Sequence, residues 1–216
     1  MLESCYMQPM RHDPISYMQP KSPSQKNWTG VTRILRYLKG TIDFALTYGR
    51  LEDWKPELTH YVDADGGTNP HRKSISGYVF TIAKGAVSWS SKKQSVTALS
   101  MAESKYVAVM HATKQLLWHR YLFNELNIPQ PKKSILWFDN QATIAICHNS
   151  EFHARTKHID ISLHFLCDYV EAGTMEIQYV PLHENLANIF TKRLPCQIHE
   201  YMTTGLGLLP VQGGVL

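Results

Sequence analysis

The spacing of apolar residues changes along the chain, and each change predicts a different kind of element. In NWTGVTRILRYLKGT, Trp28, Val31, Leu35 and Leu38 recur at helical spacing, and Gly40 follows as a stop signal. From about residue 58 the period becomes two. The segments LTHYVDADG, SISGYVFTI and AVSWSSK therefore predict three strands, of which the last two form a hairpin around the turn AKG.

The second half alternates helical patterns with short apolar runs. A helix is predicted from Ser100 to about Leu126, with an interruption along its length, and Pro129 closes it. After it come the strand SILWFDN, the helices QATIAICHN and TKHIDISLHFLCDYVEAG, the strand MEIQYVP and the short helix HENLANIFTKR. Five strands in this order predict an α/β fold in which helices pack on a mixed sheet.

The long helix begins with two charged residues of different character. Ser100 and Glu103 form a Ser-x-x-Glu capping box, which gives Glu103 a role in starting the helix. Lys105 instead falls on an apolar face, which it shares with residues 98, 101, 102, 108, 109 and 112. Two interpretations remain open from spacing alone: the ammonium reaches water at the edge of this face, or it meets a buried carboxylate.

Composition and charge narrow the class of protein. The chain has 216 residues, 44% of them hydrophobic and 19% charged, which is typical of a globular protein. Its net charge of +4 permits a nucleic-acid partner without requiring one. No apolar run is long enough to span a membrane and the N-terminus lacks the order of a signal peptide, so we expect an intracellular protein, in cytoplasm or nucleus, without a membrane partner.

Two carboxylates lie where a sheet enzyme places its chemistry. Asp63 is inside the first strand of the sheet, and Asp139 ends the fourth. An aspartate in an apolar strand is costly unless it is paired, hydrogen-bonded or bound to a metal. Together, in adjacent strands, the two predict a site of hard oxygen ligands for a divalent cation.

A chain of motifs gives these residues a context. The runs YVDADGGTNPHRKSISGYVF, VSWSSKKQ, ALSMAESKY, LWFDNQATIAI, HARTKHIDI and YVPLHENLANIFTKRLP resemble the ribonuclease H domain of copia-type retrotransposon Pol polyproteins. The preceding WTGVTRILRYLKGTIDFALTYG resembles the connection segment that follows the reverse transcriptase in those polyproteins. The resemblance implies a ribonuclease H-like mixed five-stranded sheet with helices on both faces. It also implies cleavage of the RNA strand of RNA-DNA hybrids by two Mg²⁺ ions held by four carboxylates.

The resemblance divides the chain into four parts. Residues 1–26 are an irregular leader, residues 27–55 the helical connection segment, residues 56–195 the ribonuclease H-like domain and residues 196–216 a flexible tail.

The family has four acidic positions, and only two of them carry an acid in this chain. Two of them fall on Asp63 and Asp139, which are present. The family's glutamate before the tyrosine of EAEY falls on Lys105, and the aspartate of LADIFTK falls on Asn188. Lys105 is therefore expected to face the place of the metals, within reach of Asp63 or Asp139.

Nearby residues offer limited replacement for the missing acids. Glu184 stands one helical turn before Asn188, which would place it on the same face, although it is more simply a first-turn acid. His183 lies in the loop where ribonuclease H enzymes often carry a histidine, but its spacing differs and a surface position is the simpler interpretation. Because Mg²⁺ depends on carboxylate ligands, an ammonium in the site predicts weak binding of the ion at Asp63 and Asp139.

Three functions remain open from the sequence. The first is a ribonuclease H-like domain whose cleavage activity is lost or impaired. The second is a non-catalytic module that binds hybrid or duplex nucleic acid through a set of basic residues, whose simpler interpretation is an ordinary solvated surface: Arg72, Lys73, Lys92, Lys93, Arg155 and Lys157. The third is a decayed retroelement relic. We expect a monomer whose partners are nucleic acid and the rest of a Pol polyprotein.

Overall fold

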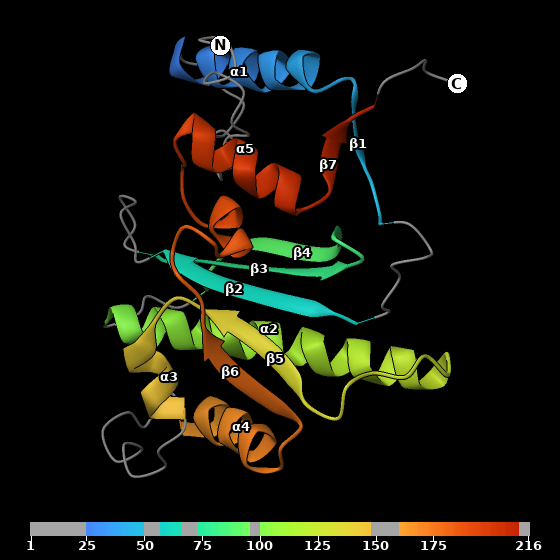
Figure 1. Ribbon diagram of the computed structural model, residues 1–216. Helices are drawn as coiled ribbons and strands as arrows, with labels where there is room; N and C mark the ends of the chain where they lie inside the picture. Colours follow the sequence, from blue (N-terminus) through green and yellow to red (C-terminus); the bar gives the residue numbers. More distant parts are fainter. Residues whose placement is uncertain (1–24, 50–56, 66–72, 96–99, 148–159, 212–216) are drawn as a thin grey trace.

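The computed structural model describes residues 25–49, 57–65, 73–95, 100–147 and 160–211 (Figure 1). The predicted mixed five-stranded sheet is present, in the order β4-β3-β2-β5-β6. Its strands are β2 (Thr59–Asp65), β3 (Ile75–Ile82), β4 (Gly85–Lys93), β5 (Ser134–Phe138) and β6 (Met175–Tyr179). β3 pairs antiparallel with both β2 and β4, whereas β5 pairs parallel with both β2 and β6. The fold class predicted from the sequence is thereby confirmed.

The predicted hairpin joins β3 to β4 through only two residues. Ala83 and Lys84 both have positive φ, 47° and 66°, the backbone conformation that a tight hairpin turn requires. Gly85 follows with no room for a side chain, because an added Cβ would lie 2.5 Å from the ring of Tyr48. The motif AKG therefore ends in glycine because the segment after β1 passes directly over it.

Helices cover both faces of the sheet (Figure 1). On one face lie α2 (Met101–Glu125), α3 (Gln141–Cys147) and α4 (Asp160–Glu171), whose apolar residues join Val62, Leu136 and Phe138 in the largest buried cluster. On the other face lie η5 (Leu186–Phe190), a 3-10 helix, and α5 (Cys196–Gly205), which enclose a second cluster around Val79 and Met202. The sheet is thus buried on both sides, as its apolar strands require.

The helix α2 differs from the prediction in one respect, since it runs without interruption for 25 residues. No proline or glycine occurs within it, so nothing in its backbone chemistry breaks it. It ends where Asn127 adopts positive φ, 54°, shortly before Pro129. Its expected inward face is buried at Lys105, Ala108, Val109 and Ala112, whereas Met101, in the first turn, is exposed.

The predicted flexible tail is wrong for most of its length. Residues 196–205 form α5, and β7 (Leu208–Pro210) pairs antiparallel with β1 (Phe44–Leu46), which follows the first helix, α1 (Gln25–Gly40). Met202 and Leu206 are buried in the cluster between α5 and the sheet. Gly205 and Gly207 in this segment are positions of close approach, to Leu186 and to the Thr47 carbonyl.

Among the described residues, no helix is long and apolar enough to cross a membrane.

Candidate functional site

The two aspartates lie side by side at one edge of the sheet. The parallel register of β2 and β5 pairs Val62 with Phe138, so the next residues, Asp63 and Asp139, follow at the same level. Asp63 is 1% exposed, and the side chain of Asp139 is 4% exposed. Two carboxylates are therefore held close together and almost without water.

Lys105 projects from α2 to this pair. Its Nζ donates to Asp139 Oδ1 over 3.1 Å and lies 5.3 Å from the centre of the Phe138 ring. Lys105 is itself 9% exposed, so the ion pair is shielded from solvent. The expected contact with a buried aspartate is confirmed, and the aspartate is Asp139.

The other aspartate is held by residues that the sequence analysis did not single out. Lys192 places its Nζ 3.4 Å from Asp63 Oδ2, and the hydroxyl of Thr191 donates to the same oxygen. Both residues follow η5, where their backbone N–H groups bond the Asn188 carbonyl. The available signal was the TK that ends LANIFTK, the motif that contains Asn188.

Asn188 is buried beside this turn and does not stand free to serve as a ligand. It is 1% exposed, and its Nδ2 donates to the Leu182 carbonyl. Its Oδ1, like Asp63 Oδ1, has no hydrogen-bond partner among the residues that the structure describes. The amide therefore leaves one buried oxygen at the position of the family's last acid, without its charge.

A second asparagine fixes η5 against the sheet. Asn185 caps this helix by accepting from the Ala187 N–H, and its Nδ2 donates to the carbonyl of Val62, next to Asp63. Asn185 is 0% exposed. The sequence analysis missed it because an asparagine before a short helix is ordinarily a local cap, and only the tertiary structure shows its bond to the strand.

Glu184 does not occupy the position expected for a replacement ligand. The helix begins at Leu186, after the cap Asn185, so Glu184 precedes it instead of sharing a face with Asn188. Its Oε1 lies 3.4 Å from His183 Nε2, and these side chains are 50% and 73% exposed. The surface interpretation of His183 is consistent with this exposure.

The Ser100 half of the predicted capping box is present at the start of α2. The Ser100 hydroxyl accepts from the Glu103 N–H over 3.1 Å, with Ser100 in the cap position. Lys105, two residues later, is turned to the buried side of the helix.

Burial raises the pKa of the Asp139 carboxyl, and the neighbouring charge of Asp63 raises it further. Lys105 and, less strongly, Lys192 act in the opposite direction. Two carboxylates are thus opposed by two ammonium groups, and the formal charge of the group is zero.

The residues present do not fit a pair of Mg²⁺ ions. Such ions need anionic oxygens, and both anions of this site already contact lysines. Within the described ranges, no three His, Cys, Asp or Glu side chains gather in a way that could hold a metal. The family's motif LADIFTK has a lysine at the position of Lys192, so this lysine is not a departure from the family. Lys105 and Asn188 are the residues in which this site differs from the family's motifs.

Of the six basic residues proposed to bind nucleic acid, three are described. Lys92 and Lys93 end β4, paired with Ser76 and Ile75, while the Lys73 ammonium donates to the Ser95 carbonyl over 2.7 Å. Because Asp65 also pairs with Ile75, these lysines lie at the same end of the sheet as the aspartates. Arg72, Arg155 and Lys157 lie outside the described residues.

Comparison with known proteins gives close relatives among transposon polyproteins. The chain is 38% identical over 176 residues to a retrovirus-related Pol polyprotein from transposon TNT 1-94 of Nicotiana tabacum, covering 81% of this chain and 13% of that protein. It is 32% identical over 198 residues to the corresponding polyprotein from transposon RE2 of Arabidopsis thaliana, covering 90% of this chain and 14% of the relative. The chain thus spans about one seventh of the length of these relatives.

No family model matches the sequence. Among solved structures, LC11-RNase H1, isolated from compost, aligns with a TM-score of 0.48 and 14% identity, over 63% of this chain and 94% of the other.

Proposed function

Because the chain belongs to the Pol polyproteins of copia-type retrotransposons and contains their ribonuclease H-like domain, we propose that this domain holds nucleic acid without cleaving it. One observation carries the proposal: the Lys105 ammonium lies 3.1 Å from Asp139, at a position where the family has a glutamate. A cation is fixed where an anionic ligand for Mg²⁺ is required.

Asn188 strengthens the case for lost cleavage. An amide oxygen can contribute a dipole to a metal site but no charge, and the Nδ2 of Asn188 is already bonded to the Leu182 carbonyl. Without the second and fourth acids, Asp63 and Asp139 supply only half of the negative charge that balances two divalent ions. We infer that Mg²⁺ binds weakly at these two residues.

The proposed ligand is RNA-DNA hybrid or duplex, held by its phosphates. Lys73, Lys92 and Lys93 lie at the end of the sheet beyond the aspartates, where a backbone crossing the site would pass. Arg72, Arg155 and Lys157 are proposed to extend this surface. Binding through such contacts is insensitive to sequence and falls as salt rises, because each contact releases counterions but reads no base.

Cleavage is tested by a nicking assay on labelled hybrid, with Mg²⁺ or Mn²⁺ and with EDTA. The proteins are the parent, Lys105→Glu, Asn188→Asp and the double variant. We expect no metal-dependent nicking by the parent and recovered nicking by the double variant, in which all four acids are present. The triple variant that adds Asp63→Asn is the matched control and should again be inactive.

A melting experiment on the same proteins reports on the metal without requiring activity. Mg²⁺ should raise the melting temperature of the double variant and leave that of the parent unchanged, since only a protein that binds the ion is stabilised by it. Robust metal-dependent nicking by the parent would contradict the proposal and show that other acids complete the site.

Binding is tested separately, by fluorescence anisotropy of labelled hybrid over a range of salt concentrations. The parent should bind, and the Lys92→Gln, Lys93→Gln variant should bind more weakly with a shallower dependence on salt. Lys133→Gln, at an exposed lysine paired with Glu176, is the control for a general loss of charge. An affinity that does not change between low and high salt would exclude phosphate contacts as its source.

A further inference from the structure

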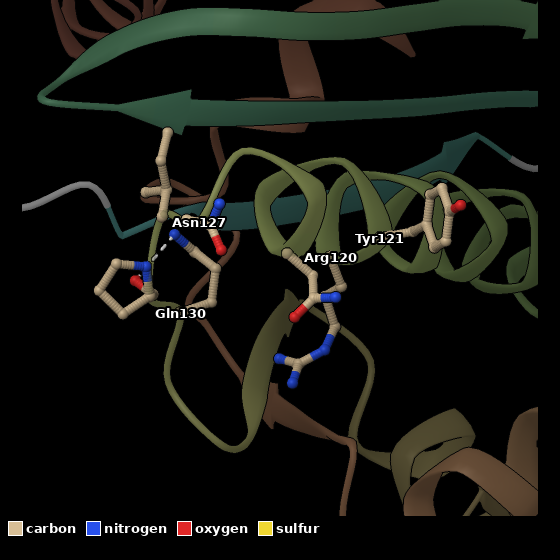
Figure 2. A pocket seen from close by; sticks show the side chains of 7 residues that line it. Arg120, Tyr121, Asn127 and Gln130 are labelled. Atoms are coloured by element: carbon tan, nitrogen blue, oxygen red, sulfur yellow. Dashed lines mark hydrogen bonds between the residues drawn. The ribbon is translucent and has the colours of Figure 1, made fainter.

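A pocket lies at the C-terminal end of α2, outside the carboxylate site (Figure 2). It has a volume of about 760 Å³ and includes Arg120, Tyr121 and Gln130 in its lining. The Arg120 guanidinium donates to the Pro131 and Lys132 carbonyls and to the Ser134 hydroxyl, so its charge serves to hold the loop before β5. The neighbouring outward surface of α2 is more informative.

Aromatic and basic side chains share the outward side of α2. His111, Lys114, Trp118 and Tyr121 follow one another at intervals of three, four and three residues, which makes each the neighbour of the next on the helix surface. Trp118 is 53% exposed and Tyr121 66% exposed. We call these four residues the α2 outer face.

The buried residues of α2 lie on another side of the helix. Lys105, Ala108, Val109 and Ala112 are buried, and all but Lys105 belong to the main core cluster. The helix therefore packs against the core with one side and carries an exposed tryptophan and tyrosine on the other. Two neighbouring exposed aromatic side chains offer a partner a large apolar contact area with a polar tip.

Two basic residues lie near His111 on this face. Lys92, on the edge strand β4, and Lys114 both act on His111. Burial, and then these two charges, lower the pKa of His111. The acidic residues of α2, Glu103 and Glu125, stand near its two ends, and Lys114 lies between them. The face is thus complementary to a negatively charged partner.

We propose that the α2 outer face binds a single strand of nucleic acid, with bases stacked on Trp118 and Tyr121 and phosphates beside Lys92 and Lys114. Aromatic platforms within a basic surface are how proteins hold unpaired strands without reading their sequence. A duplex offers the same phosphates but keeps its base faces stacked inside, so the aromatic pair favours the single strand. This surface shares Lys92 with the proposed hybrid-binding residues, but Trp118 and Tyr121 lie more than three helical turns beyond Lys105, outside the carboxylate site. Its binding does not depend on whether that site cleaves.

The test measures binding of a labelled oligothymidylate by anisotropy and by quenching of tryptophan fluorescence. Trp118→Ala should weaken binding about tenfold, the loss typical of one stacking contact. Trp89→Ala is the matched control: Trp89 is 56% exposed on β4. Its strand neighbour Ser91 bonds the Phe190 carbonyl on the η5 side of the sheet, so Trp89 faces away from α2. This control should leave the affinity unchanged.

Two further measurements separate the phosphate contacts from the stacking contacts, and hybrid binding from single-strand binding. Lys114→Gln should make the dependence of log affinity on log salt shallower by about 0.7, the share of one phosphate contact on a single strand. Hybrid binding should be weakened by Lys93→Gln and retained by Trp118→Ala. Absence of oligothymidylate binding by the parent, equal loss in Trp89→Ala and Trp118→Ala, or parallel loss of hybrid and single-strand binding in Trp118→Ala would each overturn the proposal.

Discussion

Lys105 and Lys192 each hold one of two adjacent buried aspartates, and the two lysines differ in their surroundings. The side chain of Lys105 is 11% exposed, whereas that of Lys192 is 29% exposed. Lys192 can therefore exchange its contact for water at lower cost, while Lys105 is committed to Asp139. The stability of the group depends most on Lys105.

Lys105→Glu should lower the free energy of unfolding in the absence of metal by about 3–5 kcal/mol, the range measured when one partner of a buried pair is lost. The variant places a third carboxylate beside two others. Urea unfolding in EDTA measures the effect, with Lys105→Met as a control that removes the charge without reversing it and should lose less. A Glu variant as stable as the parent would show that Lys105 does not relieve repulsion in this group.

Asp139 should titrate above the ordinary aspartate range. Burial raises its pKa most, and Lys105 opposes the shift, so Lys105→Met should raise the pKa of Asp139 further. Because the folded state then keeps a proton that the unfolded state has lost, the contribution of Asp139 to stability is present at low pH and declines as pH rises through this range. Carboxyl ¹³C NMR measures both pKa values; a lower pKa in the Met variant would contradict the assignment.

At the scale of elements, the contact between η5 and the sheet positions the part of the site that lies next to Asp63. Gly77, which pairs with Asp63 across β2 and β3, lies under η5. An added Cβ there would come within 2.5 Å of Thr191 Cγ2 and 2.9 Å of Phe190 Cβ. Glycine is needed because the helix passes directly over the strand.

Gly77→Ala should therefore destabilise the protein by about 1–3 kcal/mol, the usual range for overpacking, by moving η5 and its Thr191 away from Asp63. The matched variant is Gly77→Ala with Thr191→Ser, which removes the clashing methyl group and keeps the hydroxyl that donates to Asp63. Thermal unfolding of both should show partial recovery in the double variant. Equal losses in the two proteins would mean that this methyl group is not what the alanine displaces.

At the scale of the whole molecule, a histidine buried in the centre of the sheet makes the stability of the fold depend on pH in the acid range. His60 is 1% exposed on β2, its Nδ1 lies 2.9 Å from the Ile135 carbonyl, and its ring packs against Phe80. Burial, above all, lowers the pKa of His60 to about 4. The folded protein therefore keeps this ring neutral within its core.

Between about pH 6.5 and pH 4, the unfolded chain should bind a proton at His60 that the folded chain excludes. Stability should consequently fall as pH decreases through this window. His60→Asn, which does not titrate, should flatten the dependence of unfolding free energy on pH, although it is less stable throughout. His183→Asn, at a 73% exposed side chain, is the control and should keep the slope of the parent. An unchanged slope in His60→Asn would assign the effect to other groups.

The sequence by itself determined the elements and part of the site. Apolar spacing located the five strands, the hairpin and α2, because these patterns depend on which side chains within a few residues share a face. Spacing also placed Lys105 on the apolar face of α2, but it left open whether the ammonium reaches water or a buried carboxylate. The expectation that Lys105 lies near Asp63 or Asp139 came from the family resemblance. Neither could choose between the two aspartates as the partner of Lys105, since that choice depends on how α2 lies across the sheet.

Only the tertiary structure decided the remaining contacts. Thr191 meets Asp63 across 128 positions of the chain, and Phe44 pairs with Pro210, so no local pattern signals either contact. The same packing turned an expected flexible tail into α5 and β7, and it left Glu184 outside η5, on the surface. Local periodicity records which side of an element is apolar, but the partner of each buried charge is fixed by which distant element covers it.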